Sequence, residues 1–187
     1  MEEILAKITD FGDKAHGDQR RKYSPDRYMV HPVRVMQTCG KYTDDISVLA
    51  AALLHDVLED TPVTAGEIER FLNGLINAEE TQRALGLIID LTDVYTKEAY
   101  PKLNRRARKS KEVERLSKIR QDAQTVKYAD IIDNSSEIVS SDPSFARVFL
   151  MEARAILQKM DSGNPELYKI AVETVNNALK AVDRNKY

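Results

Sequence analysis

Hydrophobic residues recur along most of the chain at intervals of three and four, the spacing of amphipathic α-helices. Alternation with a period of two, bounded by turn residues, is scarcely visible. The pattern predicts helices at about 3–16, 32–41, 46–59, 65–74, 79–92, 96–101, 106–120, 122–140, 143–160 and 164–183. Thr64 opens one of them with the spacing of a capping box, and Pro143 opens another. We therefore expect an all-α fold of about ten helices, forming a single domain over residues 1–187.

The predicted helix over 46–59 ends on unusually acidic chemistry. Its apolar stripe runs into the segment His55-Asp56-Val57-Leu58-Glu59-Asp60-Thr61, which Pro62 follows. At about 100° per residue, Asp56 would stack with Asp60 and His55 with Glu59, so that His55 and Asp56 point in different directions. Carboxylates at a helix C-terminus meet the negative end of the helix dipole, and a divalent metal held by His55 and Asp56 would relieve that repulsion. The alternative is a buried histidine bonded to its neighbour, followed by a solvated acidic helix end.

Further candidate ligands lie in two other segments. His31 directly precedes Pro32, which suits the first position of a helix, so His31 is expected at a helix start. Asp130 interrupts an otherwise apolar helix, and Asn134 lies one turn further on the same face.

The pattern of His31, His55-Asp56 and Asp130 resembles the signature of HD-domain metal-dependent phosphohydrolases. Over about residues 3–180 the chain is more specifically similar to the (p)ppGpp hydrolase domain of RelA/SpoT proteins. The segments that carry this similarity are Gln19-Arg20-Arg21-Lys22, Tyr28-Met29-Val30-His31-Pro32, His55 to Thr61, Leu91-Thr92 and Lys127-Tyr128-Ala129-Asp130 to Asn134. At 187 residues the chain has the length expected of the stand-alone small alarmone hydrolases, the Mesh1-like group.

The resemblance implies an HD-domain helical fold and an enzyme of the stringent response, a phosphoric ester hydrolase that removes the 3′-pyrophosphate of ppGpp or pppGpp to give GDP or GTP. It also implies that one divalent cation, commonly Mn²⁺ in this family, is bound by His31, His55, Asp56 and Asp130. The residue types alone suit Mn, Fe or Zn better than Ca or Mg. Glu59 and Asp60 match the pair that the family associates with pyrophosphate hydrolysis, where they orient or deprotonate water.

Three residues are candidates for contact with the substrate. Arg21 and Lys22 match the family's Arg-Lys pair, in which Arg can stack on a purine base and Lys can meet phosphate. Without the resemblance, an exposed basic turn would be the preferred interpretation. Asn134 could hydrogen-bond the sugar or a phosphate, or it could be a buried Asn satisfied by backbone.

Other charged residues have plainer interpretations. A cationic run precedes the Asp130 helix and could draw in a polyanionic nucleotide, although such runs are usually solvated helix faces; it comprises Lys97, Lys102, Arg105, Arg106, Arg108, Lys109 and Lys111. His16 lies at the end of the first predicted helix, beside Gly17 as the residue that ends it, and we interpret it as structural.

The sequence departs from the family pattern after Ala129-Asp130. Family members usually carry Arg or Lys next, whereas this chain has Ile131, followed by Ile132 and Asp133 before Asn134. This departure keeps open a phosphohydrolase of another nucleotide, such as (p)ppApp or NADPH. A second alternative is a nucleotide-binding regulatory module without turnover, against which the four candidate ligands and the Glu59-Asp60 pair argue.

Composition and charge indicate which binding partners and which cellular compartment to expect. The formal net charge of −2 gives no general attraction to nucleic acid or to a membrane surface, which leaves a small nucleotide as the expected partner. The start of the chain carries no basic-then-apolar leader, and the single cysteine, Cys39, favours a reducing compartment, so we expect a cytoplasmic enzyme. The last predicted helix could form a homo-oligomer interface or pack within the chain, and we favour packing.

Overall fold

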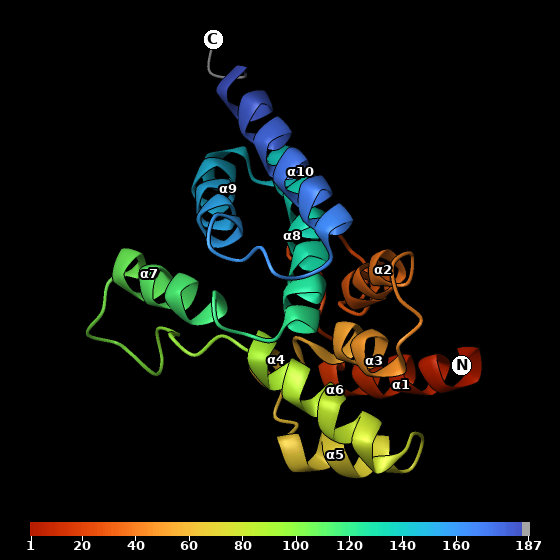
Figure 1. Cartoon of the computed structure of the whole chain (residues 1–187). Helices are drawn as coiled ribbons and strands as arrows, with labels where there is room; N and C mark the ends of the chain where they lie inside the picture. The colour runs from red at the N-terminus through yellow and green to blue at the C-terminus, as the bar shows by residue number, and fades with distance from the viewer. Residues whose placement is uncertain (185–187) are drawn as a thin grey trace. The chain divides into compact units, whose positions relative to one another are not determined.

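The computed structural model describes residues 1–184, which fold into helices and their connections (Figure 1). In chain order the helices are α1 (Glu2–His16), α2 (Val30–Cys39), α3 (Ile46–Leu54), α4 (Val57–Asp60), α5 (Ala65–Asn73), α6 (Ala78–Leu91), α7 (Arg105–Leu116), α8 (Gln121–Ser141), α9 (Pro143–Leu157) and α10 (Pro165–Arg184). An isolated antiparallel bridge between Arg20 and Arg27 is the only extended pairing among these residues. The predicted all-α fold is confirmed.

The predicted helix over 96–101 and the predicted place of Pro32 are wrong. The segment 96–101 forms a single turn, closed by the Tyr100 amide donating to the Thr96 carbonyl at 3.1 Å, and it goes no further. Pro101 follows Tyr100, and a proline disfavours the α conformation of the residue before it. α2 begins at Val30, so Pro32 occupies the third helical position instead of the first. The first turn tolerates it there because its amide groups have no partner within the helix.

The chain divides into two compact units, and the first spans Met1–Thr92. Its centre is α3, whose nine residues are all buried. The helix is apolar on every side because α1, α2 and α6 all pack against it. α5 packs on α6, and Phe71 of α5 stacks on Phe11 of α1 with ring centroids 4.1 Å apart. A capping box between Thr64 and Glu67 opens α5, as predicted.

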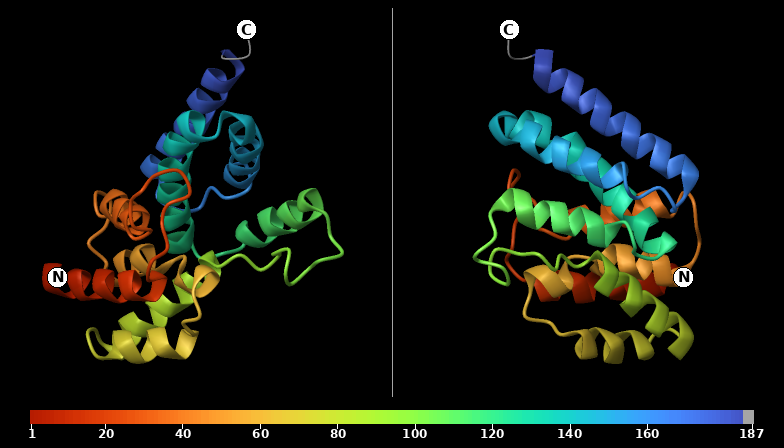
Figure 2. Two further views of the ribbon diagram at one scale, coloured as in Figure 1. Left: turned by 180° about the vertical axis from the view of Figure 1, so that it is seen from behind. Right: turned by 60° about the vertical axis from the view of Figure 1, so that its left-hand side comes forward.

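The second unit spans Asp93–Tyr187, of which the structure describes residues 93–184. Its core is formed by α8, α9 and α10, and α10 runs along both of the others (Figures 1 and 2). The buried stripe of α10 comprises Leu167, Ala171, Val175, Leu179 and Val182. The last helix therefore packs within its own unit, as favoured from the sequence. The expectation of one domain over residues 1–187 stays a prediction.

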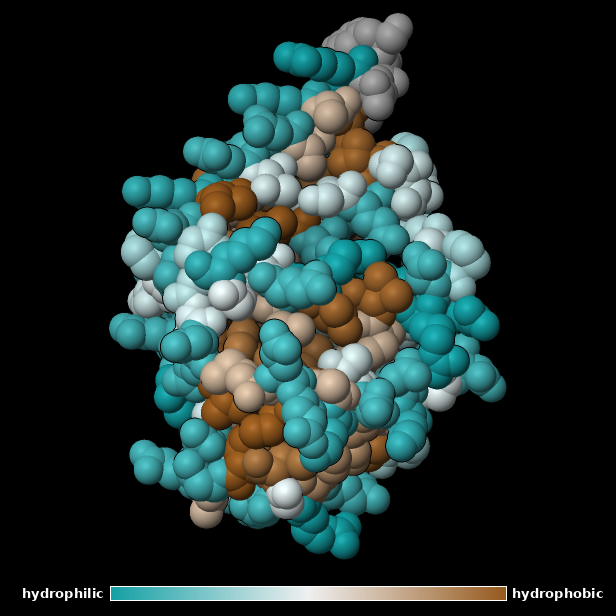
Figure 3. All heavy atoms as spheres, turned by 90° about the vertical axis from the view of Figure 1, so that its right-hand side faces the viewer, coloured by the Kyte–Doolittle hydropathy of each residue, from teal (hydrophilic) through white to brown (hydrophobic). Residues whose placement is uncertain are grey.

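The face drawn in Figure 3 is largely hydrophilic, with hydrophobic side chains among the polar ones. Exposed large hydrophobic residues in the described part of the chain include Ile89, Val148 and Met151, at 50%, 46% and 40% exposure. Isolated exposures of this kind are normal for a folded protein. None of the described helices combines the length and the apolar composition that crossing a bilayer requires.

Candidate metal centre

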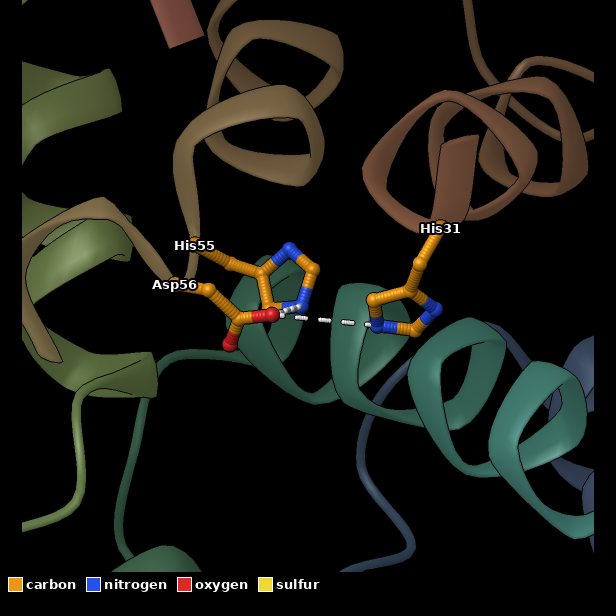
Figure 4. A group of neighbouring side chains, drawn as sticks. All are labelled: His31, His55 and Asp56. Atoms are coloured by element: carbon orange, nitrogen blue, oxygen red, sulfur yellow. Dashed lines mark ion pairs between the residues drawn. The ribbon is translucent and has the colours of Figure 1, made fainter. Parts of the chain in front are cut away.

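His31 lies in the first turn of α2 and is 1% exposed. Its backbone amide donates to the carbonyl of Tyr28 at 3.1 Å, which ties the start of the helix to the preceding loop. α2 packs against α3, and the His31 ring lies beside that of His55, the residue that follows α3 (Figure 4). The predicted position of His31 at a helix start is confirmed.

The predicted continuous helix over 46–59 is wrong at its most important point. α3 ends at Leu54, His55 and Asp56 form a turn, and α4 begins at Val57. Asp56 has φ −95° and ψ −7°, away from regular helical values, and its carbonyl accepts from the Glu59 amide at 3.2 Å and from the Asp60 amide at 2.9 Å. The turn therefore changes the directions of the side chains that a regular helix would have imposed.

As a result, His55 and Asp56 converge instead of diverging (Figure 4). His55 Nε2 lies 3.0 Å from Asp56 Oδ2, and His31 Nε2 lies 3.8 Å from the same oxygen. The two imidazole rings meet edge to face, with centroids 5.3 Å apart. One ligand atom from each of His31, His55 and Asp56 lies within 4.8 Å of the others, which makes this trio a group able to hold a metal ion.

The hydrogen bond of His55 fixes which ring nitrogen faces the group. Its Nδ1 lies 2.8 Å from the carbonyl oxygen of Ala52. A carbonyl oxygen only accepts, so Nδ1 carries the proton, and in the neutral imidazole Nε2 keeps its lone pair. A backbone carbonyl on the far nitrogen is the usual arrangement behind a metal-binding histidine.

The trio fits a divalent cation in chemistry as well as in spacing. Ligand atoms that share one first-row cation at about 2.1 Å lie roughly 3–4 Å apart, which is the range of the two distances to Asp56 Oδ2. His31 and His55 are both buried, whereas the Asp56 side chain is 22% exposed. Two imidazoles and a carboxylate favour a transition metal or zinc over calcium.

Glu59 and Asp60 lie on α4, one turn beyond the trio, and both are exposed. The Asp60 carboxylate accepts a long hydrogen bond from Gln19 Nε2, at 3.4 Å. Their predicted catalytic role stays a prediction.

Asp130 and Asn134 belong to α8, in the second unit. Asp130 is 7% exposed, and its two carboxylate oxygens accept from Lys127 Nζ at 2.8 Å and from Asn134 Nδ2 at 2.5 Å. The Asn134 side chain is thus bonded to a carboxylate one turn earlier on its own helix. The assignment of Asp130 as a fourth ligand and of Asn134 as a substrate contact stays a prediction.

Arg21 and Lys22 lie in the loop between α1 and α2, as predicted. The loop is closed by the Arg21 amide donating to the Asp26 carbonyl at 3.0 Å. The Arg21 guanidinium lies 5.7 Å from the centre of the Tyr28 ring, and Lys22 Nζ donates to the Tyr23 hydroxyl at 2.7 Å. Their contact with a substrate stays a prediction.

Sequence reasoning missed Tyr28. Its hydroxyl donates to Asp56 Oδ2 at 2.8 Å, the same oxygen that faces both histidines. Burial raises the pKa of this phenol, and the negative charges of Asp56 and Asp60 raise it further, so it remains a neutral donor. The signal was its place three residues before His31, next to a helix start, but an aromatic residue there is equally typical of packing.

Part of the predicted cationic run is held in ion pairs within its unit. Arg105 forms a two-pronged pair with Glu152 of α9, at 2.8 and 2.7 Å, and Lys109 pairs with Asp93 at 2.9 Å. His16 is buried and stacks on Tyr28, and Gly17 has φ 56° and donates to the Asp13 carbonyl. Only glycine adopts that backbone conformation without strain, which agrees with the helix end predicted there.

A family model of the HD domain matches residues 28–135, more than half of the chain. That span contains each of the four predicted metal ligands and the Glu59-Asp60 pair.

Among curated proteins, guanosine-3′,5′-bis(diphosphate) 3′-pyrophosphohydrolase MESH1 of Mus musculus is 33% identical over 144 residues, covering 75% of this chain and 72% of MESH1. The Homo sapiens MESH1 is 34% identical over 143 residues, with 74% and 72% covered. A probable guanosine-3′,5′-bis(diphosphate) 3′-pyrophosphohydrolase of Mycoplasma pneumoniae is 23% identical and matches 98% of this chain, which spans only 25% of that protein's length.

A solved structure has the same fold. It is described as a metazoan ortholog of SpoT that hydrolyzes ppGpp, and it superposes with a TM-score of 0.77 at 23% identity, covering 93% of this chain and 94% of the other. The extent of the family match and the similarity to MESH1 over most of both chains lead to one conclusion: the chain belongs to the HD domain family.

Proposed function

We propose that this protein is a metal-dependent 3′-pyrophosphohydrolase of ppGpp and pppGpp. The observation that carries the proposal is the convergence of His31, His55 and Asp56 in a chain of the HD family whose MESH1 relatives carry that activity in their names. Water would add its oxygen to the phosphorus next to the 3′ oxygen, and the bond between that phosphorus and the 3′ oxygen would break. The 3′ oxygen takes a proton, so GDP or GTP and pyrophosphate leave.

His31 and His55 would hold the cation through Nε2, and Asp56 through Oδ2. We assign Asp130 as the fourth ligand and Mn²⁺ as the ion. When bound, such an ion lowers the pKa of a coordinated water and polarises a phosphoryl oxygen. The chain's own contribution is to hold the His55 imidazole with the Nε2 lone pair toward the trio, which the Nδ1 bond to the Ala52 carbonyl favours.

Glu59 and Asp60 are the proposed proton acceptors. A base must reach the attacking water, and exposure on the short helix α4 directly after the Asp56 turn leaves both carboxylates accessible to solvent. Neither carboxylate belongs to the trio that can hold a metal, which leaves them available for proton transfer.

Arg21, Lys22 and Asn134 are the proposed substrate contacts. Arg21 and Lys22 lie in the same loop as Tyr28, and this loop leads directly to His31, so a nucleotide bound there would lie near the trio. Asn134 already binds Asp130, so a substitution at Asn134 would disturb the carboxylate as well as any nucleotide contact. The expected partner is therefore a small nucleotide, and we expect the enzyme to act in the cytoplasm.

A second candidate is hydrolysis of a different nucleotide, (p)ppApp or NADPH. Ile131 supports this second candidate. The residue follows Asp130, where family members usually carry Arg or Lys, and Ile131 is only 3% exposed. A buried isoleucine cannot supply the charge that such a basic residue would offer to a phosphate. A nucleotide-binding module without turnover is the third outcome.

The test is a product assay with ppGpp, ppApp and NADPH in the presence of Mn²⁺. The lead proposal expects pyrophosphate from ppGpp, and loss of most turnover in Glu59→Gln while Mn²⁺ stays bound. Glu79→Gln, an exposed acid in the first turn of α6, is the matched control and should behave as wild type. Free phosphate from NADPH alone, or no product at all, would replace the proposal with one of the two alternatives.

A further inference from the structure

Tyr28 connects the α1–α2 loop to the trio through one hydrogen bond. Its O–H donates to Asp56 Oδ2 at 2.8 Å, and that oxygen lies 3.0 Å from His55 Nε2. A carboxylate oxygen has two lone pairs, so Oδ2 can accept from Tyr28 and still offer a lone pair to a cation shared with the histidines. The hydroxyl therefore acts on the oxygen on which the trio converges.

The ring of Tyr28 is held on several sides. His16 stacks on it with ring centroids 4.4 Å apart and an interplanar angle of 28°. His31 meets it edge to face at 6.4 Å, and the Arg21 guanidinium lies 5.7 Å from its centre. A ring confined in this way cannot move its hydroxyl far without disturbing its neighbours.

The backbone of Tyr28 is fixed as well. Its amide donates to the Gln19 carbonyl at 3.1 Å, next to the bridge between Arg20 and Arg27. The Gln19 side chain lies 2.9 Å from His16 Nδ1 and also donates to Asp60. Side chains from the two ends of this loop thus reach the carboxylates of both Asp56 and Asp60.

An aspartate carboxylate rotates easily about its last torsion, because the terminal bond of Asp has a broad energy minimum. A donor fixed on one oxygen removes that freedom before a cation arrives. Partners of this kind typically change metal affinity by about 10- to 100-fold.

We propose that Tyr28 is a positioning residue whose hydroxyl holds the Asp56 carboxylate with Oδ2 toward His31 and His55. The inference rests on the metal centre of the proposed function and adds a residue to it. Tyr28 acts through Asp56, and its ring also lies 5.7 Å from the guanidinium of Arg21, a proposed substrate contact in the same loop.

The test is Tyr28→Phe, which keeps the ring and removes only the hydroxyl. Calorimetric titration of the nucleotide-free protein with Mn²⁺ should give an affinity weaker by about 10- to 100-fold. With ppGpp at saturating Mn²⁺, kcat should fall while KM changes little. Tyr168→Phe is the matched control, because its hydroxyl donates to the Leu157 carbonyl at 3.1 Å within the second unit, and it should keep wild-type affinity.

Circular dichroism and thermal melting without metal establish that Tyr28→Phe is folded. If the folded variant binds Mn²⁺ as tightly as the wild type, the inference about Tyr28 is overturned. The proposed function would still stand if the wild type hydrolyses ppGpp. Weaker Mn²⁺ binding by the variant, with no ppGpp turnover by the wild type, would support Tyr28 and overturn the proposed function. A wild-type protein that binds no Mn²⁺ would overturn both.

Discussion

His55 Nε2 and Asp56 Oδ2 lie 3.0 Å apart, although consecutive residues of a continuous helix point about 100° away from each other. The end of α3 at Leu54 makes this approach possible, because the turn at His55 and Asp56 redirects both side chains. Glu59 and Asp60 then fall on a separate short helix, α4. The break in the helix thus separates the proposed ligands from the proposed proton acceptors.

Asp56→Asn tests the centre directly. The amide removes the negative charge between two imidazoles while keeping the shape, so Mn²⁺ affinity should fall by at least about 100-fold, as expected for a ligand and not an outer partner. At 100 times the wild-type Kd, Mn²⁺ should stabilise the wild type by about 2.7 kcal/mol and Asp56→Asn by no more than about 0.4 kcal/mol, as measured by thermal shift. Asp44→Asn, an exposed acid before α3, serves as control. Equal Mn²⁺ stabilisation of both variants would contradict the assignment.

Arg106→Glu tests whether the cationic run attracts the substrate. Arg106 is exposed, whereas Arg105 is engaged with Glu152, so reversal at Arg105 would also break an ion pair between α7 and α9. If the run attracts the substrate, the KM of Arg106→Glu for ppGpp should be roughly two- to five-fold higher than that of the wild type at low ionic strength. The difference should shrink as salt is added. Lys180→Glu, an exposed reversal on α10, should show a smaller effect. If both variants behave alike, the run is a solvated helix face.

Cys39 is expected to make stability depend on alkaline pH. Burial raises the pKa of its thiol from 9.0 to about 12, so above pH 9 the unfolded chain loses this proton while the native protein keeps it. Its contribution to stability is complete below pH 9 and is lost between pH 9 and about 12, at up to about 1.4 kcal/mol per pH unit. The urea midpoint of wild type should therefore fall faster with pH than that of Cys39→Ala. Parallel pH profiles would show that the thiol does not contribute.

Glu112→Gln is expected to destabilise the second unit. Glu112 is 2% exposed, accepts from the amides of Val94 and Tyr95 at 3.2 and 3.0 Å, and pairs with Arg115. Loss of its charge should cost about 1–3 kcal/mol, because each of these bonds is made to a buried carboxylate. Glu114→Gln removes only an exposed pair with Lys118 at 3.0 Å, so its free energy of unfolding should stay close to that of the wild type. Urea denaturation of both variants compares them, and equal losses would contradict the proposed role of Glu112.

The sequence by itself determined most of the helices and the residue types of the candidate centre. Intervals of three and four reflect the period of the α-helix, which is a local property, so α1, α5, α8 and α10 were predicted to within about two residues. The capping box at Thr64 and the helix end at Gly17 were also predicted from the sequence, because each depends on backbone groups only a few residues away. His31, His55 and Asp56 stood out because imidazole and carboxylate groups interrupt apolar patterns.

Tertiary structure decided how those groups meet. The break after Leu54 is not visible in the periodicity, since Val57 and Leu58 continue the apolar pattern. The bond from Tyr28 to Asp56 joins residues 28 positions apart, and no local rule encodes such a distance. Which side chains share a centre depends on how α2 packs against α3, a choice made by the burial of both helices and not by either segment alone.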